Sequence, residues 1–222
     1  MRVSVIVTRV RAAIDELMQN DSAFLRVSED EKNLTDVIID KIGYALQHVI
    51  DNAPLEKLDS SMFEELTAQE LQDSFSIDSE LVGRLTLPTD TLRIIEARLS
   101  SWSLFPLPVS PSSQVYLMQQ DKYARGSWDR PVNVLTAGVL EMYCAKTNAD
   151  TLIFKFIRKP VVAAPSQLLP DPDVSVPAQL EAALIYQIAG MAMVAFREDI
   201  AATLFALASR YTDPRQTNDT GT

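Results

Sequence analysis

Apolar residues recur at helical spacing near both ends of the chain. Residues 3–19 place an apolar side chain at every third or fourth position, the period of an amphipathic helix. A second helix of the same period is expected to begin near Ser28 or Asp30, to run to about Asp51 and to end before Pro54. Residues 178–211 are also strongly helical, and "REDIAA" within them predicts either two helices or one bent helix. We expect these three apolar stripes to pack together.

Between residues 80 and 160 the pattern changes to short runs of β-branched and aromatic residues separated by Pro, Gly, Asn and Asp. Such runs are typical of strands joined by turns. The runs fall at 81–88, 114–118, 132–135, 139–144 and 151–158. Turns at 136–138 and 148–150 would join the last three runs into a small antiparallel meander.

The remaining segments separate these parts. Residues 55–80 form an acidic excursion with room for a short helix near 62–73, 161–177 form a Pro-rich linker, and 212–222 a disordered tail. The other parts are N-terminal helices at 1–54, a β-rich module at 81–160 and a C-terminal helix or helix pair at 178–211. The predicted class is α+β: a helical body from both chain ends with an inserted small antiparallel β-module, sandwich or barrel-like.

Composition describes a chain of 222 residues, 47% hydrophobic, which is enough for one sizeable core or two small ones. Arg2, Arg9 and Arg11 interrupt the apolar start, so we expect no secretory signal. The uncharged run 182–196 is shorter than the roughly 20 residues that span a bilayer, so a buried helix is expected instead. The single cysteine, Cys144, excludes an internal disulfide and fits a reducing compartment.

The net charge of −10 is spread unevenly. Residues 15–90 hold 18 acidic and 5 basic residues, whereas 115–160 hold 4 acidic and 7 basic ones. This pattern describes either a solvated acidic surface or a protein with one acidic and one mildly basic end, suited to contacts between copies. Without a concentrated basic patch, the chain is not expected to wrap nucleic acid.

Residues with catalytic potential are few. The sole histidine, His48, lies toward the end of the second helix and is expected at its surface or at an interface, and Cys144 is expected to be an inert buried thiol. Six glycines form neither GxGxxG nor GxxxxGK[ST]. The carboxylates at 29–31 suit a helix N-terminus. We therefore predict no enzymatic activity, no cofactor and no metal site.

Eight residues are candidates for contacts with a neighbouring subunit or partner. Trp102 and Trp128 either fill the core of the β-module, or one of them anchors a neighbour. The loop 104–114 is expected to project, either to dock on another protein, its prolines limiting the entropy lost on binding, or as a simple solvent loop. Three arginines are expected at corners of the β-module, where they meet the acidic helices of the next copy or pair within their own subunit. The candidates are Arg93, Trp102, Pro106, Pro108, Pro111, Arg125, Trp128 and Arg130.

Two short motifs carry a resemblance to a known family. "LPTDTLRIIEARLSSW" at 87–102 and "QQDKYARGSWDRPV" at 119–132 resemble stretches of head-to-tail connector proteins (adaptor or ring proteins of the neck) of tailed phages, especially short-tailed and crAss-like ones. The order of elements, helices then β-module then an Ala/Leu-rich helix, is similar as well. Thr89 and Thr91 make the first motif plainer than the aromatic-rich versions of the family.

The resemblance implies a structural virion protein without an active site. It would form a homo-oligomeric ring of twelve copies at the capsid–tail junction, assembled in the host cytoplasm and stacked below the portal protein. Its partners would be other copies, the portal and other neck or tail proteins, with genomic DNA passing through the channel without specific binding and with no membrane contact. The alternatives are a cytoplasmic adaptor that uses its acidic helical hairpin and, from a third class, a carboxylate-dependent hydrolase.

Overall fold

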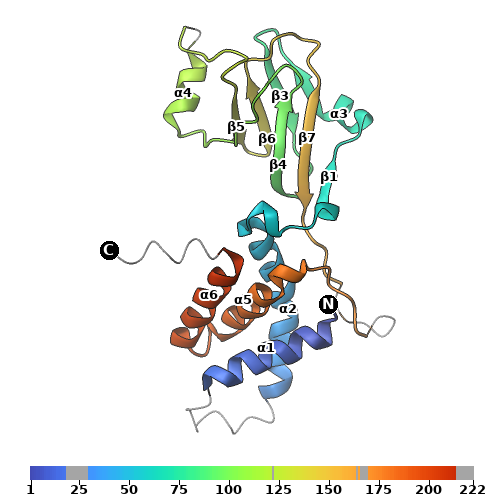
Figure 1. Cartoon of the computed structure of the whole chain (residues 1–222), viewed down its shortest axis with the longest axis vertical. Helices are drawn as coiled ribbons and strands as arrows, with labels where there is room; N and C mark the ends of the chain where they lie inside the picture. The colour runs from blue at the N-terminus through green and yellow to red at the C-terminus, as the bar shows by residue number, and fades with distance from the viewer. Residues whose placement is uncertain (19–29, 122, 164, 166–169, 214–222) are drawn as a thin grey trace. The chain divides into compact units, whose positions relative to one another are not determined.

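The computed structural model describes residues 1–18, 30–121, 123–163, 165 and 170–213 (Figure 1). The chain forms two compact units, a helical unit of Met1–Asp59 with Pro160–Thr222 and a β-module of Ser60–Lys159. The helical unit thus comes from both chain ends, and the module holds two antiparallel sheets. The predicted α+β class with an inserted β-module is confirmed.

The helical unit is built around α5 (Glu181–Met193), which packs against α1 (Val3–Met18), α2 (Asp30–Asn52) and α6 (Glu198–Thr212). Nine of the thirteen α5 residues are buried. A helix that is apolar all round needs neighbours on every side, which explains why its sequence lacks a polar face. The expected packing of the N- and C-terminal helices is confirmed. Short 3₁₀ turns, η1 (Leu55–Lys57) and η3 (Ala178–Leu180), complete the unit.

Residues 178–211, left open as one helix or two, form two helices after η3. The turn between α5 and α6 is closed by Arg197, whose guanidinium contacts Asp199 at 3.0 Å. Gly190 lets the two helices approach, since a Cβ built there would lie 2.7 Å from the ring of Phe205. A larger residue at 190 would therefore have to displace that ring.

Part of the Pro-rich linker packs against the N-terminus of the chain. Its residues 171–174 lie beside the N-terminus, where the amino group of Met1 donates to the Val174 carbonyl at 2.6 Å. The Ser4 backbone and hydroxyl both donate to the carboxylate of Asp171. Val174 is 2% exposed. This part of the linker is thus a packed component of the helical unit.

The β-module contains one three-stranded and one four-stranded antiparallel sheet. The first runs β1 (Phe63–Glu65), β7 (Leu152–Arg158), β4 (Thr91–Leu99), and the second runs β2 (Phe75–Ile77), β3 (Val82–Thr86), β6 (Val139–Tyr143), β5 (Val132–Thr136). The β5–β6 hairpin turns at Ala137 and Gly138, both at positive φ, as a tight two-residue turn requires. The predicted turn at 136–138 is confirmed.

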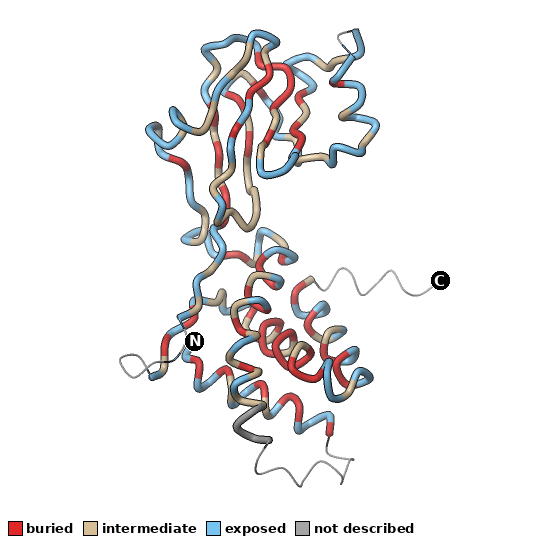
Figure 2. Tube along the Cα trace, turned by 180° about the vertical axis from the view of Figure 1, so that it is seen from behind, coloured by how far each residue is buried: buried red, intermediate tan, exposed pale blue. Residues whose placement is uncertain are grey.

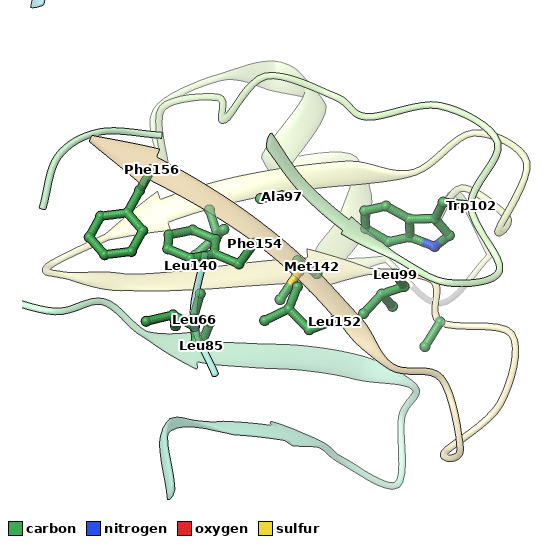
Figure 3. Packing of buried hydrophobic residues seen from close by; sticks show 11 residues of the cluster. Leu66, Leu85, Ala97, Leu99, Trp102, Leu140, Met142, Leu152, Phe154 and Phe156 are labelled. Atoms are coloured by element: carbon green, nitrogen blue, oxygen red, sulfur yellow. The ribbon is translucent and has the colours of Figure 1, made fainter. Parts of the chain in front are cut away.

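The main core of the module lies between the two sheets (Figure 3). Phe154 and Phe156 of β7 stack 5.3 Å apart and belong to one buried cluster with Leu140 and Met142 of β6. The expected meander is therefore wrong, because β7 pairs with β4 and β1 whereas β6 pairs with β3 and β5. The turn at 148–150 carries the chain from one sheet to the other.

Residues 114–118, expected to be a strand, form part of helix α4 (Gln114–Gln120). Ser113 caps the helix, its hydroxyl accepting from the backbone N–H of Tyr116 at 3.2 Å. Taken one at a time, the apolar residues of this run have propensities that favour a strand. The cap and the inward spacing of Tyr116 and Gln119 favour the helix.

The acidic excursion 55–80 also belongs largely to the module, which begins at Ser60 instead of residue 81. It contributes β1, the helix α3 (Ala68–Ser74) and β2, and Thr67 forms a capping box with Glu70 at the start of α3. Strands of three residues are too short to show an alternating pattern, so sequence could not place them. The predicted tail lies outside the described residues from 214 onward.

Candidate functional site

The two tryptophans have different environments. Trp102 is 2% exposed in the core between the sheets, and its indole N–H donates to the Cys144 carbonyl at 3.1 Å. Trp102 is therefore a core residue and offers no surface to a partner. Trp128 is 43% exposed, with the Lys146 ammonium 4.6 Å from the centre of its ring. Of the two tryptophans, only Trp128 remains a candidate for a partner contact.

Trp128 belongs to the β4–β5 connection, residues 100–131, which holds most of the candidate residues. Its prolines lie along the edge of β5: Pro106 and Pro108 are half-buried, and Pro111 is exposed. The side-chain amide of Asn133 donates to the Pro106 carbonyl at 2.9 Å and to the Ala97 carbonyl at 2.8 Å. Sequence predicted a freely projecting loop, but the structure ties the loop to the sheet.

A second attachment follows at Val109. Its backbone N–H donates to the Asn133 carbonyl at 2.8 Å, and its carbonyl accepts from Leu135 at 3.4 Å. Val109 and Val134 form a single parallel bridge, so the loop adds a short edge beyond β5. Val109 also packs on a small buried cluster that includes Val134 and Tyr143.

Helix α4 is fixed by its polar side chains. Gln119 is 4% exposed, and its side-chain oxygen accepts from the Gly126 backbone at 3.2 Å. Gln120 donates to the Tyr143 hydroxyl at 3.0 Å, and Tyr116 meets the Tyr143 ring edge-on at 6.3 Å. These contacts dock one side of α4 on the module beside β5 (Figure 1). Consequently the opposite side, with Leu117, is turned to solvent.

Exposed apolar side chains concentrate on this connection. Of the seventeen large hydrophobic residues that are exposed in the described part of the chain, eight lie between residues 104 and 128. The most exposed among them include Leu107 at 72% and Leu117 at 63%. Figure 2 shows α4 and the turns beside it drawn mostly in the colour of exposed residues. Scattered exposed apolar residues are ordinary, but such a concentration is typical of an interaction surface.

The three candidate arginines have separate roles. Arg125 pairs with Glu80 at 3.1 Å and donates to the Gln119 carbonyl at 3.0 Å, so it is engaged within its own subunit. Arg93 lies within β4 at a register shift, not at a corner as expected, and is half-buried. Arg130 is exposed in the β4–β5 connection. Sequence reasoning grouped these three, whereas the structure leaves Arg130 as the best-placed candidate for an intersubunit ion pair.

The charge asymmetry is real but differs from the expected one. The helical unit carries 10 basic and 18 acidic residues, a net charge of −8, and the β-module 10 basic and 12 acidic, a net charge of −2. The module is nearly balanced instead of basic, because much of the acidic run 55–80 belongs to it. Within the β4–β5 connection, residues 100–120 hold no charged residue at all.

The titratable groups of the module serve its structure. Burial, together with the hydroxyl's hydrogen bond to Glu141, raises the pKa of Tyr143 well above its ordinary value. Burial likewise raises the pKa of the Cys144 thiol, which donates to the Gly126 carbonyl at 2.6 Å. A thiol held in its neutral form is a poor nucleophile. His48 is exposed on α2, where sequence placed it.

An open groove of about 510 Å³ lies in the helical unit, between α2 and residues 160–163. Asp36, Asp40 and Tyr44 line it together with apolar side chains such as Ile39. Lys41 partly neutralises this wall, its ammonium lying 2.8 Å from the Asp40 carboxylate. The groove would suit a basic or mixed side chain of a partner.

Comparison with known proteins finds no matching family model and no matching curated sequence. Among the residues that the structure describes, no helix is long and apolar enough to cross a bilayer. Within the same residues, no group of three or more His, Cys, Asp or Glu side chains is arranged to hold a metal ion. The features of the molecule that bear on its function are the surface of the β4–β5 connection and the charge of the two units.

Proposed function

We propose that this protein is a structural component that assembles with copies of itself, as a ring in the portal–tail connector of a tailed bacteriophage. The observation that carries the proposal is the exposed, tethered apolar surface of the β4–β5 connection, on a chain whose other unit is strongly acidic. The particular assembly is proposed from the resemblance of two sequence motifs to stretches of head-to-tail connector proteins. One of them, residues 119–132, lies largely within this connection.

In such a ring one copy would present its module to the helical unit of the next, a heterologous contact that closes by rotation. Arg130 is exposed near the acidic Asp129, and a planar guanidinium pairs bidentately with carboxylates. The exposed carboxylates of α2, Asp36 and Asp40, are suitable partners on the next copy. The portal and other neck or tail proteins would bind the stacked faces, and DNA would pass through an acidic channel that repels its phosphates.

A charge reversal tests the ring contact. Electron microscopy of the purified chain, alone and mixed with a portal ring, should show rings for the wild type. Arg130→Glu should fold normally but form fewer rings at moderate salt, and Asp36→Lys in the same chain should restore them in part. Arg210→Glu, an equal charge change at an exposed residue of α6, is the matched control. If Arg130→Glu forms rings as readily as wild type, Arg130 is not part of the ring contact.

A second candidate, a protein-interaction adaptor, is favoured by the acid-lined groove beside α2. In this role the helical unit would bind a basic segment of another protein while the chain itself stays monomeric. Light scattering separates the two proposals, because the adaptor predicts a single-chain mass in the absence of its partner.

A further inference from the structure

We infer that the apolar surface of the β4–β5 connection is covered by a second copy of this chain. This surface is formed by the exposed side chains of Leu104, Phe105, Leu107, Leu117, Met118 and Trp128. The inference rests on the proposed self-assembly and deepens it by naming the surface that one copy buries against another, in a pair of copies or in a ring.

The size of the surface fits a protein partner. The six residues are between 43% and 72% exposed, and a standard interface buries ~800 Å² on each partner. Val115 and Leu135, also exposed, extend the surface on α4 and β5. These exposed apolar residues therefore suit a contact with a protein partner.

The surface is also held in place before binding. Asn133 and Val109 attach the loop to β5, and two prolines restrict its backbone. The buried Gln119 and the capped start of α4 fix the helix. Because little conformational entropy remains to be lost, more of the burial free energy contributes to association. Pro106 and Pro108 cannot donate backbone hydrogen bonds, so the contact is made by side chains and not by strand addition.

The distribution of charge favours a second copy of the chain as the partner that covers this surface. The chain has a net charge of −10, so most faces of one copy repel the corresponding faces of another. Residues 99–120, which carry five of the six side chains, contain no Asp, Glu, Lys or Arg. These five side chains of two copies can therefore approach without like-charge repulsion, and the Lys146 ammonium lies only beside the sixth, Trp128. An anionic lipid surface is the less suitable occupant, since the acidic chain as a whole is repelled by it.

Sedimentation velocity of the full chain tests the inference, with Leu104→Ser/Leu107→Ser as the variant. Both side chains are exposed, so the substitutions should leave the fold intact, as checked by circular dichroism. Val194→Ser/Phe196→Ser is the matched control, since these residues are 54% and 56% exposed on the helical unit. We expect the wild type and the control to associate, and the variant to associate more than about tenfold more weakly.

Salt separates this contact from the proposed Arg130 contact. Association through apolar surface should persist or strengthen in molar NaCl, whereas an ion pair between exposed groups weakens there. A wild type that stays monomeric at high protein concentration would overturn both the inference and the proposed function. A variant that associates as tightly as wild type would overturn the inference alone. A monomer that floats with neutral lipid vesicles would overturn it too, and would assign the surface to a membrane. Association without rings would contradict the proposed function alone.

Discussion

Replacement of Asn133 is the most informative perturbation of the β-module. Asn133 is fully buried, and its amide group donates to the carbonyls of Ala97 and Pro106, joining β5 to β4 and to the exposed loop. Its side-chain oxygen is also buried but has no hydrogen-bond partner among the described residues. The residue therefore combines two favourable interactions with one unfavourable one.

The expected cost of Asn133→Ala follows from these groups. Two lost hydrogen bonds contribute about 1 kcal/mol each, and the buried Ala97 carbonyl left without a donor adds about 1–3 kcal/mol. Removal of the unpaired side-chain oxygen returns about 1–3 kcal/mol. The Pro106 carbonyl is only partly buried, so water can replace the amide there. The net loss in the free energy of unfolding should be about 2 kcal/mol.

Tryptophan fluorescence in a urea titration measures this change in the module alone, because both tryptophans of the chain, Trp102 and Trp128, lie in it. Limited proteolysis should also show faster cleavage of the released loop around Leu107. Asn148→Ala, at an exposed turn position, is the control and should stay within about 0.5 kcal/mol of wild type. An Asn133→Ala module as stable and as resistant to proteolysis as wild type would refute the tethering role.

Three further changes test other parts of the fold. Gly190→Ala should destabilise the helical unit by about 1 kcal/mol in thermal unfolding. The clash with Phe205 costs about 1–3 kcal/mol, which exceeds the gain of about 1 kcal/mol in helix propensity. Adding Phe205→Leu should recover most of the loss. Gly138→Ala should cost the module about 1 kcal/mol in urea titrations, since φ is +82° there; an unchanged midpoint would contradict the turn geometry. Burial raises the pKa of Asp150, but the hydrogen bonds from Ser101 and from two backbone N–H groups outweigh it and lower the pKa overall. Asp150 therefore stabilises the module fully above its unfolded pKa near 4, and this contribution is lost as pH falls through the lower folded pKa. Asp150→Asn should accordingly weaken the dependence of the module's free energy of unfolding on pH at acid pH.

Sequence predicted the helical unit well because its signal is local. The apolar periods of α1, α2 and the two C-terminal helices match buried residues such as Ile6, Ile42 and Leu184. Each helix presents several turns of the same pattern, so one exceptional residue does not change the prediction. The packing followed because each stripe needed an apolar partner.

The module was harder to predict because its pairing is not local. Strands β1 and β2 have three residues each, and β7 lies between partners from two distant segments. The residues of α4 favour a strand individually, whereas the cap at Ser113 and the docking of Gln119 depend on the folded module. Local propensity therefore gave the wrong element there.

For the candidate site, sequence singled out the stretch that the structure shows to be exposed and apolar, but not the roles of its residues. Trp102 and Trp128 look alike in sequence, and only the sandwich decides which one is buried. Arg125 pairs with Glu80, 45 positions away, a contact that no local pattern signals. Asn133 was missed, although one polar residue among the apolar residues of "PVNVL" is the available signal for a buried hydrogen-bonding group.

The central claim, that this chain works as an assembly of its own copies, is tested most directly by the mass of the purified wild-type protein in solution. Native mass spectrometry at micromolar concentration, alone and with a portal ring, gives the number of 24.7 kDa chains in each particle. The account predicts particles of several chains, with a closed ring in the presence of the portal. A single-chain mass under both conditions would contradict it.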